Sequence, residues 1–169
     1  MANSTFSGPV RSQNGFKSVT KNTTTGAITE ITTYGGAPVS LADGDVTLTN
    51  ATHSGRTLVV PNGTQDNTYT LPSPVAGAYF SFVYGGGAAD ATDFIVDTGA
   101  DANFFIGNVA FNDTDDGAAS VVFSDGDSNS KVQVNVPAAA QIHIMALDGT
   151  NWQIWGTVSG ATAPAFADQ

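Results

Sequence analysis

Cysteine is absent from the 169-residue chain, which excludes disulfide bonds and thiolate metal sites. Charged residues make up only 12% of the sequence, about half of the roughly 25% that is typical of soluble domains. Glutamate occurs once, and there are three lysines and five leucines, so strong helix formers are scarce. No run approaches the roughly 20 apolar residues of a membrane span, and we therefore expect no membrane partner.

Glycine and proline are plentiful instead, with 19 and 7 residues, and they separate short β-prone runs from residue 41 onward. Residues 79–84 and 131–136 alternate apolar and polar side chains. This pattern predicts an all-β fold, a β-sandwich or jelly-roll-like barrel. A β-helix is the alternative, but no fixed short repeat supports it. The expected strands are residues 45–49, 56–61, 68–71, 79–84, 94–97, 104–111, 120–124, 131–136, 141–147 and 152–158.

Charge divides the chain into two unequal parts. Arg11, Lys17 and Lys21 are three of the five basic residues, and they precede the first acidic residue, Glu30. The remainder carries all fifteen acidic residues, within a net charge of −10. Because an acidic body repels phosphate, we expect no nucleic-acid partner. The basic N-terminal segment is better suited to an acidic protein surface.

The N-terminal segment is also distinct in its pattern. Residues 16–20 and 27–33 are β-prone and flank a turn, which predicts a hairpin with too few apolar residues for a core of its own. Since an isolated hairpin is marginal in water, this one is expected to need a docking surface. We therefore expect an extended N-terminal arm at residues 1–40, a sandwich domain at 41–160 and a loose C-terminal tail at 161–169.

Catalytic residue types are few. His53 and His143 are the only side chains that titrate near neutral pH without a large pKa shift, and neither lies in a nucleophile motif. We therefore expect neither enzymatic activity nor a cofactor. His143 lies in an expected strand and is predicted to pack or to face a subunit interface. Trp152 and Trp155 have an odd spacing, which places them on opposite faces of a strand, and Trp155 is the expected interface anchor.

One acidic loop has two interpretations. Asp125, Asp127 and Asn129 reproduce the alternate-ligand spacing that begins an EF-hand, and a looser calcium site would use these oxygens. However, Ser130 stands where the EF-hand requires glycine, and Val136 where it requires glutamate. The other interpretation is a set of Asx turns that cap their own backbone. It is favoured, so no metal is expected.

Several segments resemble one family when taken together. They are SGPVRSQNGF at residues 7–16, RTLVVP at 56–61 with YTLP at 69–72, and DGTNW at 148–152, inside a closing hairpin at 141–159. These resemble head decoration (cement) and head-fibre proteins of tailed bacteriophages. The DGTNW element also occurs in tail-fibre-like proteins. The resemblance implies a non-enzymatic, commonly homotrimeric protein that sits on the capsid exterior, often through an N-terminal segment.

This resemblance and the charge pattern give one expected function. The protein would decorate the outside of a phage capsid, assembled in the host cytoplasm, with the major capsid protein as its partner. The expected capsid-binding residues are Phe6, Arg11, Phe16, Lys17 and Lys21. The expected subunit-interface residues are His143 and Trp155. The alternative is a receptor-binding fibre module that holds a glycan, and a polysaccharide-active enzyme is a third hypothesis.

Overall fold

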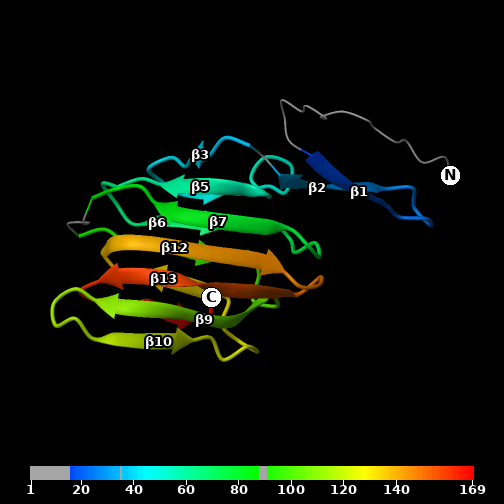
Figure 1. Cartoon of the computed structure of the whole chain (residues 1–169). Helices are drawn as coiled ribbons and strands as arrows, with labels where there is room; N and C mark the ends of the chain where they lie inside the picture. Colours follow the sequence, from blue (N-terminus) through cyan, green and yellow to red (C-terminus); the bar gives the residue numbers. More distant parts are fainter. Residues whose placement is uncertain (1–15, 35, 88–90) are drawn as a thin grey trace, which may run out of the picture.

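The computed structural model describes residues 16–34, 36–87 and 91–169. Over these residues the chain forms strands only, and no helix is long and apolar enough to cross a membrane. Two sheets pack face to face, and a two-stranded hairpin stands beside them (Figure 1). The predicted all-β sandwich is confirmed.

The seven-stranded sheet faces the viewer in Figure 1, in the order β10-β9-β13-β12-β7-β5-β3. Its strands are β3 (Val39–Ser40), β5 (Arg56–Val60), β7 (Tyr79–Tyr84), β9 (Phe104–Asp113), β10 (Ala119–Phe123), β12 (Pro137–Ala146) and β13 (Asn151–Gly160). The five-stranded sheet, in the order β14-β11-β8-β6-β4, contains β4 (Val46–Thr47), β6 (Asn67–Thr70), β8 (Phe94–Asp97), β11 (Lys131–Val134) and β14 (Ala165–Ala167). The hairpin is β1 (Phe16–Lys21) and β2 (Ile28–Tyr34). All ten strands expected after residue 41 are present, whereas β3 and β14 were not expected.

The first half of the sandwich winds like a β-helix. Strands β3, β5 and β7 run parallel in one sheet, and β4, β6 and β8 run parallel in the other. The chain therefore crosses between the sheets after each strand. Val39, Leu58 and Phe82 stack across the three coils, but at unequal intervals in the sequence. The β-helix alternative is therefore present in this half of the sandwich. It lacks the fixed sequence repeat by which a β-helix is usually recognised.

Both ends of the sandwich differ from the expected boundaries. The C-terminal segment is not loose, because β14 pairs with β11 and the Phe166 ring packs edge-on against Phe105 at a centroid distance of 6.3 Å. One large apolar side chain is enough to hold it, since the partner strand supplies the backbone hydrogen bonds. At the other end, β3 already belongs to the seven-stranded sheet, so the sandwich begins before residue 41.

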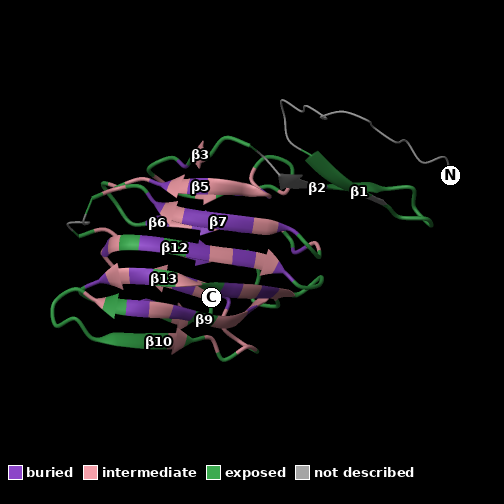
Figure 2. Ribbon diagram, in the orientation of Figure 1, coloured by how far each residue is buried: buried purple, intermediate pink, exposed green. Residues whose placement is uncertain are grey.

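The core lies between the two sheets. Along β12 and β13, buried residues alternate with more exposed ones over most of the strand (Figure 2). Tyr69 from the five-stranded sheet lies 6.2 Å from Phe82 of the seven-stranded sheet. Trp152 and Phe80 meet edge-to-face at 5.8 Å, a favoured aromatic geometry. These four side chains are at most 1% exposed, so the strands are positioned by one continuous apolar interior.

Candidate interaction surfaces

The N-terminal hairpin is held by its turn and by an ion pair. Asn22 Oδ1 accepts the backbone N–H groups of the residues two and three positions later, at 2.9 and 3.0 Å. Gly26 has a φ of 74°, which glycine adopts without steric cost. Lys17 Nζ lies 2.9 Å from Glu30 Oε2 across the two strands. The predicted hairpin is therefore confirmed, and part of the expected basic charge is already neutralised within it.

One face of this hairpin carries two exposed apolar side chains, two lysines and Glu30. Lys21 lies opposite Ile28 in the register, and directly opposite residues project to the same side. Val19 is 57% exposed and Ile28 is 63% exposed. The other face carries Ile31, which is buried in the apolar cluster of the sandwich. Glu30 lies directly opposite Val19 on the same face and pairs with Lys17. We call the exposed face the hairpin patch: Lys17, Val19, Lys21, Ile28 and Glu30.

A second surface is the outer face of the seven-stranded sheet. Its strands alternate between buried inward positions and outward positions, and the register carries each position across the sheet. Over the described strands, no outward position holds Asp, Glu, Lys or Arg. We call this surface the neutral face: Thr57, Val59, Tyr79, Ser81, Val83, Ile106, Asn108, Ala110, Val121, Phe123, Ala139, Gln141, His143, Met145, Gln153, Trp155, Thr157 and Ser159.

The other sheet shows where charge does occur. On the outer face of the five-stranded sheet, Asp97 and Lys131 lie directly opposite one another. The Asp93 carboxylate accepts hydrogen bonds from the Gln133 side chain at 2.6 Å and from the Val136 N–H at 2.8 Å. The outer face of the five-stranded sheet thus carries charged side chains, whereas the neutral face carries none on the described strands.

An aromatic ridge crosses the neutral face. His143 lies opposite Trp155, and their ring centroids are 5.5 Å apart at an interplanar angle of 29°. The Tyr79 ring lies 5.9 Å from His143 at 12° and 6.1 Å from Trp155 at 34°, so the three rings form one triangular cluster. Burial lowers the pKa of His143, and its Nδ1 lies within hydrogen-bonding distance, 2.6 Å, of the Tyr79 hydroxyl oxygen. Trp155 remains 38% exposed, and Trp152, by contrast, is fully buried.

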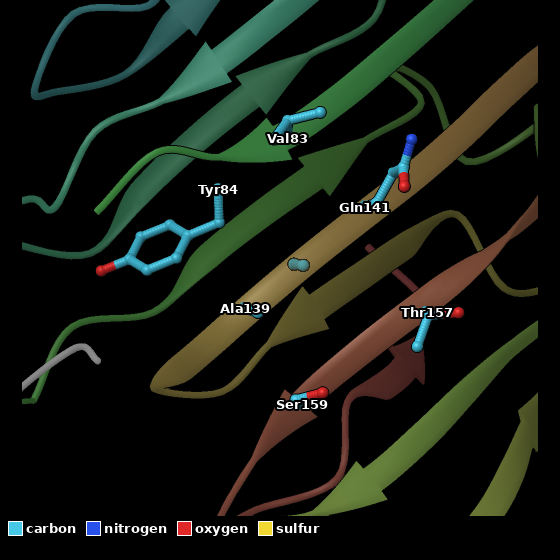
Figure 3. Close-up of a pocket in the computed structure, with 7 residues that line it drawn as sticks. Val83, Tyr84, Ala139, Gln141, Thr157 and Ser159 are labelled. Carbon is cyan, nitrogen blue, oxygen red and sulfur yellow. The ribbon is translucent and has the colours of Figure 1, made fainter. Parts of the chain in front are cut away.

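A hollow of about 290 Å³ lies beside the ridge on the same face. Figure 3 shows Val83, Gln141 and Thr157 around it on the neighbouring strands β7, β12 and β13. Ser159 and Ala139 complete this part of the rim with short side chains. Thr157 and Ser159 follow Trp155 by two and four residues, which is about 7 and 13 Å along a strand. Ridge and hollow are therefore neighbours on one surface.

The acidic turns use their carboxylates to cap their own backbone. Asp125 Oδ1 accepts the N–H groups of Asp127, Ser128 and Asn129 at 3.0–3.3 Å, and Asn129 Oδ1 accepts the Asp125 N–H at 2.9 Å. These are the oxygens that a calcium ion would require. The described residues also contain no group of three or more His, Cys, Asp or Glu side chains placed to hold a metal.

The capping role of Asp125 predicts a pH dependence. Hydrogen bonds from Ser128 and Asn129 lower the pKa of Asp125 to about 2. A lowered folded-state pKa stabilises the fold above the ordinary value near 4, and this stabilisation is lost as the pH falls through about 2. An Asp125→Ala variant should therefore unfold at lower denaturant concentration than the wild type at pH 7, with the gap closing towards pH 2. A gap that is constant with pH, or a calcium-induced rise in the wild-type midpoint, would contradict this role.

In the closing hairpin, at residues 141–159, a carboxylate also caps the backbone of its own turn. Asp148 Oδ1 accepts the N–H groups of Thr150 and Asn151, both at 2.7 Å, and its Oδ2 accepts the Asn151 side-chain amide at 2.9 Å. The hydrogen bonds from the Asn151 side chain and from both backbone N–H groups lower the pKa of Asp148. Gly149 is not among the glycines with a positive φ. The DGTNW segment is thus a carboxylate-capped turn, and its backbone does not need a left-handed glycine.

The remaining candidates for chemistry have structural partners. Ser54 is fully buried, and its Oγ accepts the Tyr79 N–H at 3.2 Å. His53 Nδ1 accepts the Thr49 N–H at 2.9 Å, and burial lowers the pKa of His53. Both side chains therefore fix the turn before β5.

The predicted site residues fall into three groups. Phe6 and Arg11 lie outside the described residues. Phe16, Lys17 and Lys21 lie on β1, and His143 and Trp155 stack on one another within the neutral face. Sequence reasoning missed Val19 and Ile28, although the turn at residues 22–26 fixes the register that brings them to one face.

Comparison with known proteins assigns no family, since no protein-family model and no curated protein matches the chain.

Proposed function

We propose that this protein is a non-enzymatic virion structural protein that decorates and stabilises the outside of a phage capsid, as a homotrimer. The observation that carries the proposal is the hairpin patch. It presents Val19 and Ile28 to solvent beside Lys17 and Lys21, on an element whose opposite face is anchored through Ile31. An exposed apolar patch of this kind marks an interaction site.

The proposed mechanism is mechanical. The hairpin patch buries its apolar side chains on the major capsid protein, while Lys21, whose charge Glu30 does not neutralise, meets an acidic group there. Contact with more than one capsid subunit adds binding free energy that holds neighbouring subunits together. The acidic sandwich then stays in water, where its net charge opposes nonspecific association.

A full-length double variant, Val19→Ser with Ile28→Ser, tests this function by co-sedimentation with undecorated capsids. We expect binding about 10-fold weaker or more, because two aliphatic side chains lose their buried area. The matched control is Leu147→Ser, which alters an aliphatic residue that is 44% exposed on the sandwich, and it should bind as the wild type does. Circular dichroism confirms that each variant is folded.

The outcomes separate the alternatives. Wild-type binding that the double variant retains would place the capsid contact elsewhere and overturn the role of the hairpin patch. No saturable binding by the wild type would overturn capsid decoration itself. Binding measured at increasing salt concentration then gives the contribution of ionic contacts to the binding free energy, because the Debye length falls from about 10 Å at 0.1 M to about 3 Å at 1 M.

The alternative function, glycan binding, would use exposed aromatic rings as a platform. Tyr79, His143 and Trp155 form such a cluster, with centroid distances of 5.9, 6.1 and 5.5 Å. Capsid decoration remains the proposed function because the hairpin patch is a separate exposed surface that glycan binding does not explain.

A further inference from the structure

We propose that the neutral face is the surface on which a second copy of this chain docks. The chain has a net charge of −10, so two copies repel one another over most orientations. The neutral face is where the described strands let them approach without desolvating an ionised side chain, a step that costs several kcal/mol for an unpaired ion. A partner of opposite charge would instead select an acidic surface.

The shape of the neutral face also favours a second copy of the chain as the partner. Trp155 rises from β13 within the aromatic ridge, and the hollow lies two to four residues further along the same strand. A surface that carries both a projection and a neighbouring depression can dock on a further copy, the ridge of one copy entering the hollow of the next. Partly exposed aromatic rings and neutral hydrogen-bonding groups, here Gln141 and Thr157, are also typical of the centre of protein interfaces.

The neutral face is large enough for a standard protein–protein interface. Seven strands give six spacings of about 4.8 Å, or roughly 29 Å of width, and ten-residue strands reach about 33 Å. Strands β9, β12 and β13 have that length, and the outer strands are shorter. The face therefore approaches the roughly 800 Å² that each partner buries in a standard interface. Val121 and Phe123, which are 48% and 65% exposed on β10, extend its apolar area to the sheet edge.

This inference rests on the proposed function in one respect only, the number of copies, three. The choice of the neutral face as the contact surface rests instead on its lack of charged side chains and on its shape. The two are tested separately, because the molar mass of the free protein is measured without capsids.

Light scattering after size exclusion gives the test. We expect the full chain at micromolar concentration to have two or three times its monomer mass of 17.2 kDa. A Thr157→Lys variant places a cation in the hollow, at an exposed position that the fold tolerates, and should raise the dissociation constant by about 100-fold or more. Trp155→Ala, which removes the ridge, should weaken association in the same direction.

Ala165→Lys is the matched control, because it introduces the same side chain at an exposed strand position of the other sheet. It should keep the wild-type mass. A monomeric wild type would overturn the proposal, as would Thr157→Lys and Trp155→Ala variants that both keep the wild-type mass. A monomer whose capsid binding is lost in Thr157→Lys would reassign the neutral face to the capsid contact, and the proposal would again fail.

Discussion

A Trp152→Ala variant is expected to lose about 3–5 kcal/mol of unfolding free energy, the cost of a large aromatic cavity in a packed core. Trp152 is fully buried between the sheets, and its ring meets Phe80 edge-to-face. Strands on both sides of it are paired, β12 on one and β9 on the other. Collapse into the cavity would therefore require the centre of the seven-stranded sheet to shift.

Denaturant unfolding followed by circular dichroism, at one fixed protein concentration, measures this loss. Trp152→Phe is the informative companion, because it keeps an aromatic ring in the core. It also removes an indole N–H that is buried without a hydrogen-bond partner among the described residues, so most of the stability should return. Leu147→Ala, at a position 44% exposed, should change stability by less than about 0.5 kcal/mol. A Trp152→Ala loss as small as that would show that the tryptophan is not a core residue.

The strands were predictable because burial on one face leaves an alternating pattern in the sequence. Residues 79–84 and 94–97 match β7 and β8 in full. Strand β14 escaped prediction because residues 165–167 contain a single large apolar side chain, Phe166. Its stability comes from pairing with β11, more than thirty residues away in the chain, and local pattern carries no trace of that contact.

The interaction surfaces were predictable only in part. The sequence places His143 on one strand and Trp155 on the next, and the hairpin turn between them makes their contact foreseeable. The neutral face was not foreseeable, because it depends on the order β9-β13-β12-β7, which includes a parallel pair between β9 and β13. The strand order determines which outward residues become neighbours, and the alternation of apolar and polar residues does not predict the strand order.

The second large effect is expected at Gly156, which lies between Trp155 and Thr157 on β13. Its φ is 155°, a conformation that side-chain-bearing residues rarely adopt. A Cβ atom here would overlap the Gln141 carbonyl oxygen and lie 2.8 Å from the Ile142 Cα. Both contacts are with the backbone of β12, which cannot rotate away as a flexible side chain would.

A Gly156→Ala variant should therefore lose about 3–5 kcal/mol, the combined cost of backbone strain and overpacking. The pairing between β13 and β9 is interrupted at this point, between Ile154 and Thr157, whereas Gly156 stays paired with Ile142 of β12, so the strain falls on the β12–β13 pairing that holds Trp155 and Thr157. The same denaturant titration measures the loss. Gly149→Ala is the control, because its Cβ would meet no atom within 4 Å, and its midpoint should stay close to the wild-type value. Equal midpoints for the two variants would mean that β12 and β13 lie further apart at Gly156 than the structure places them.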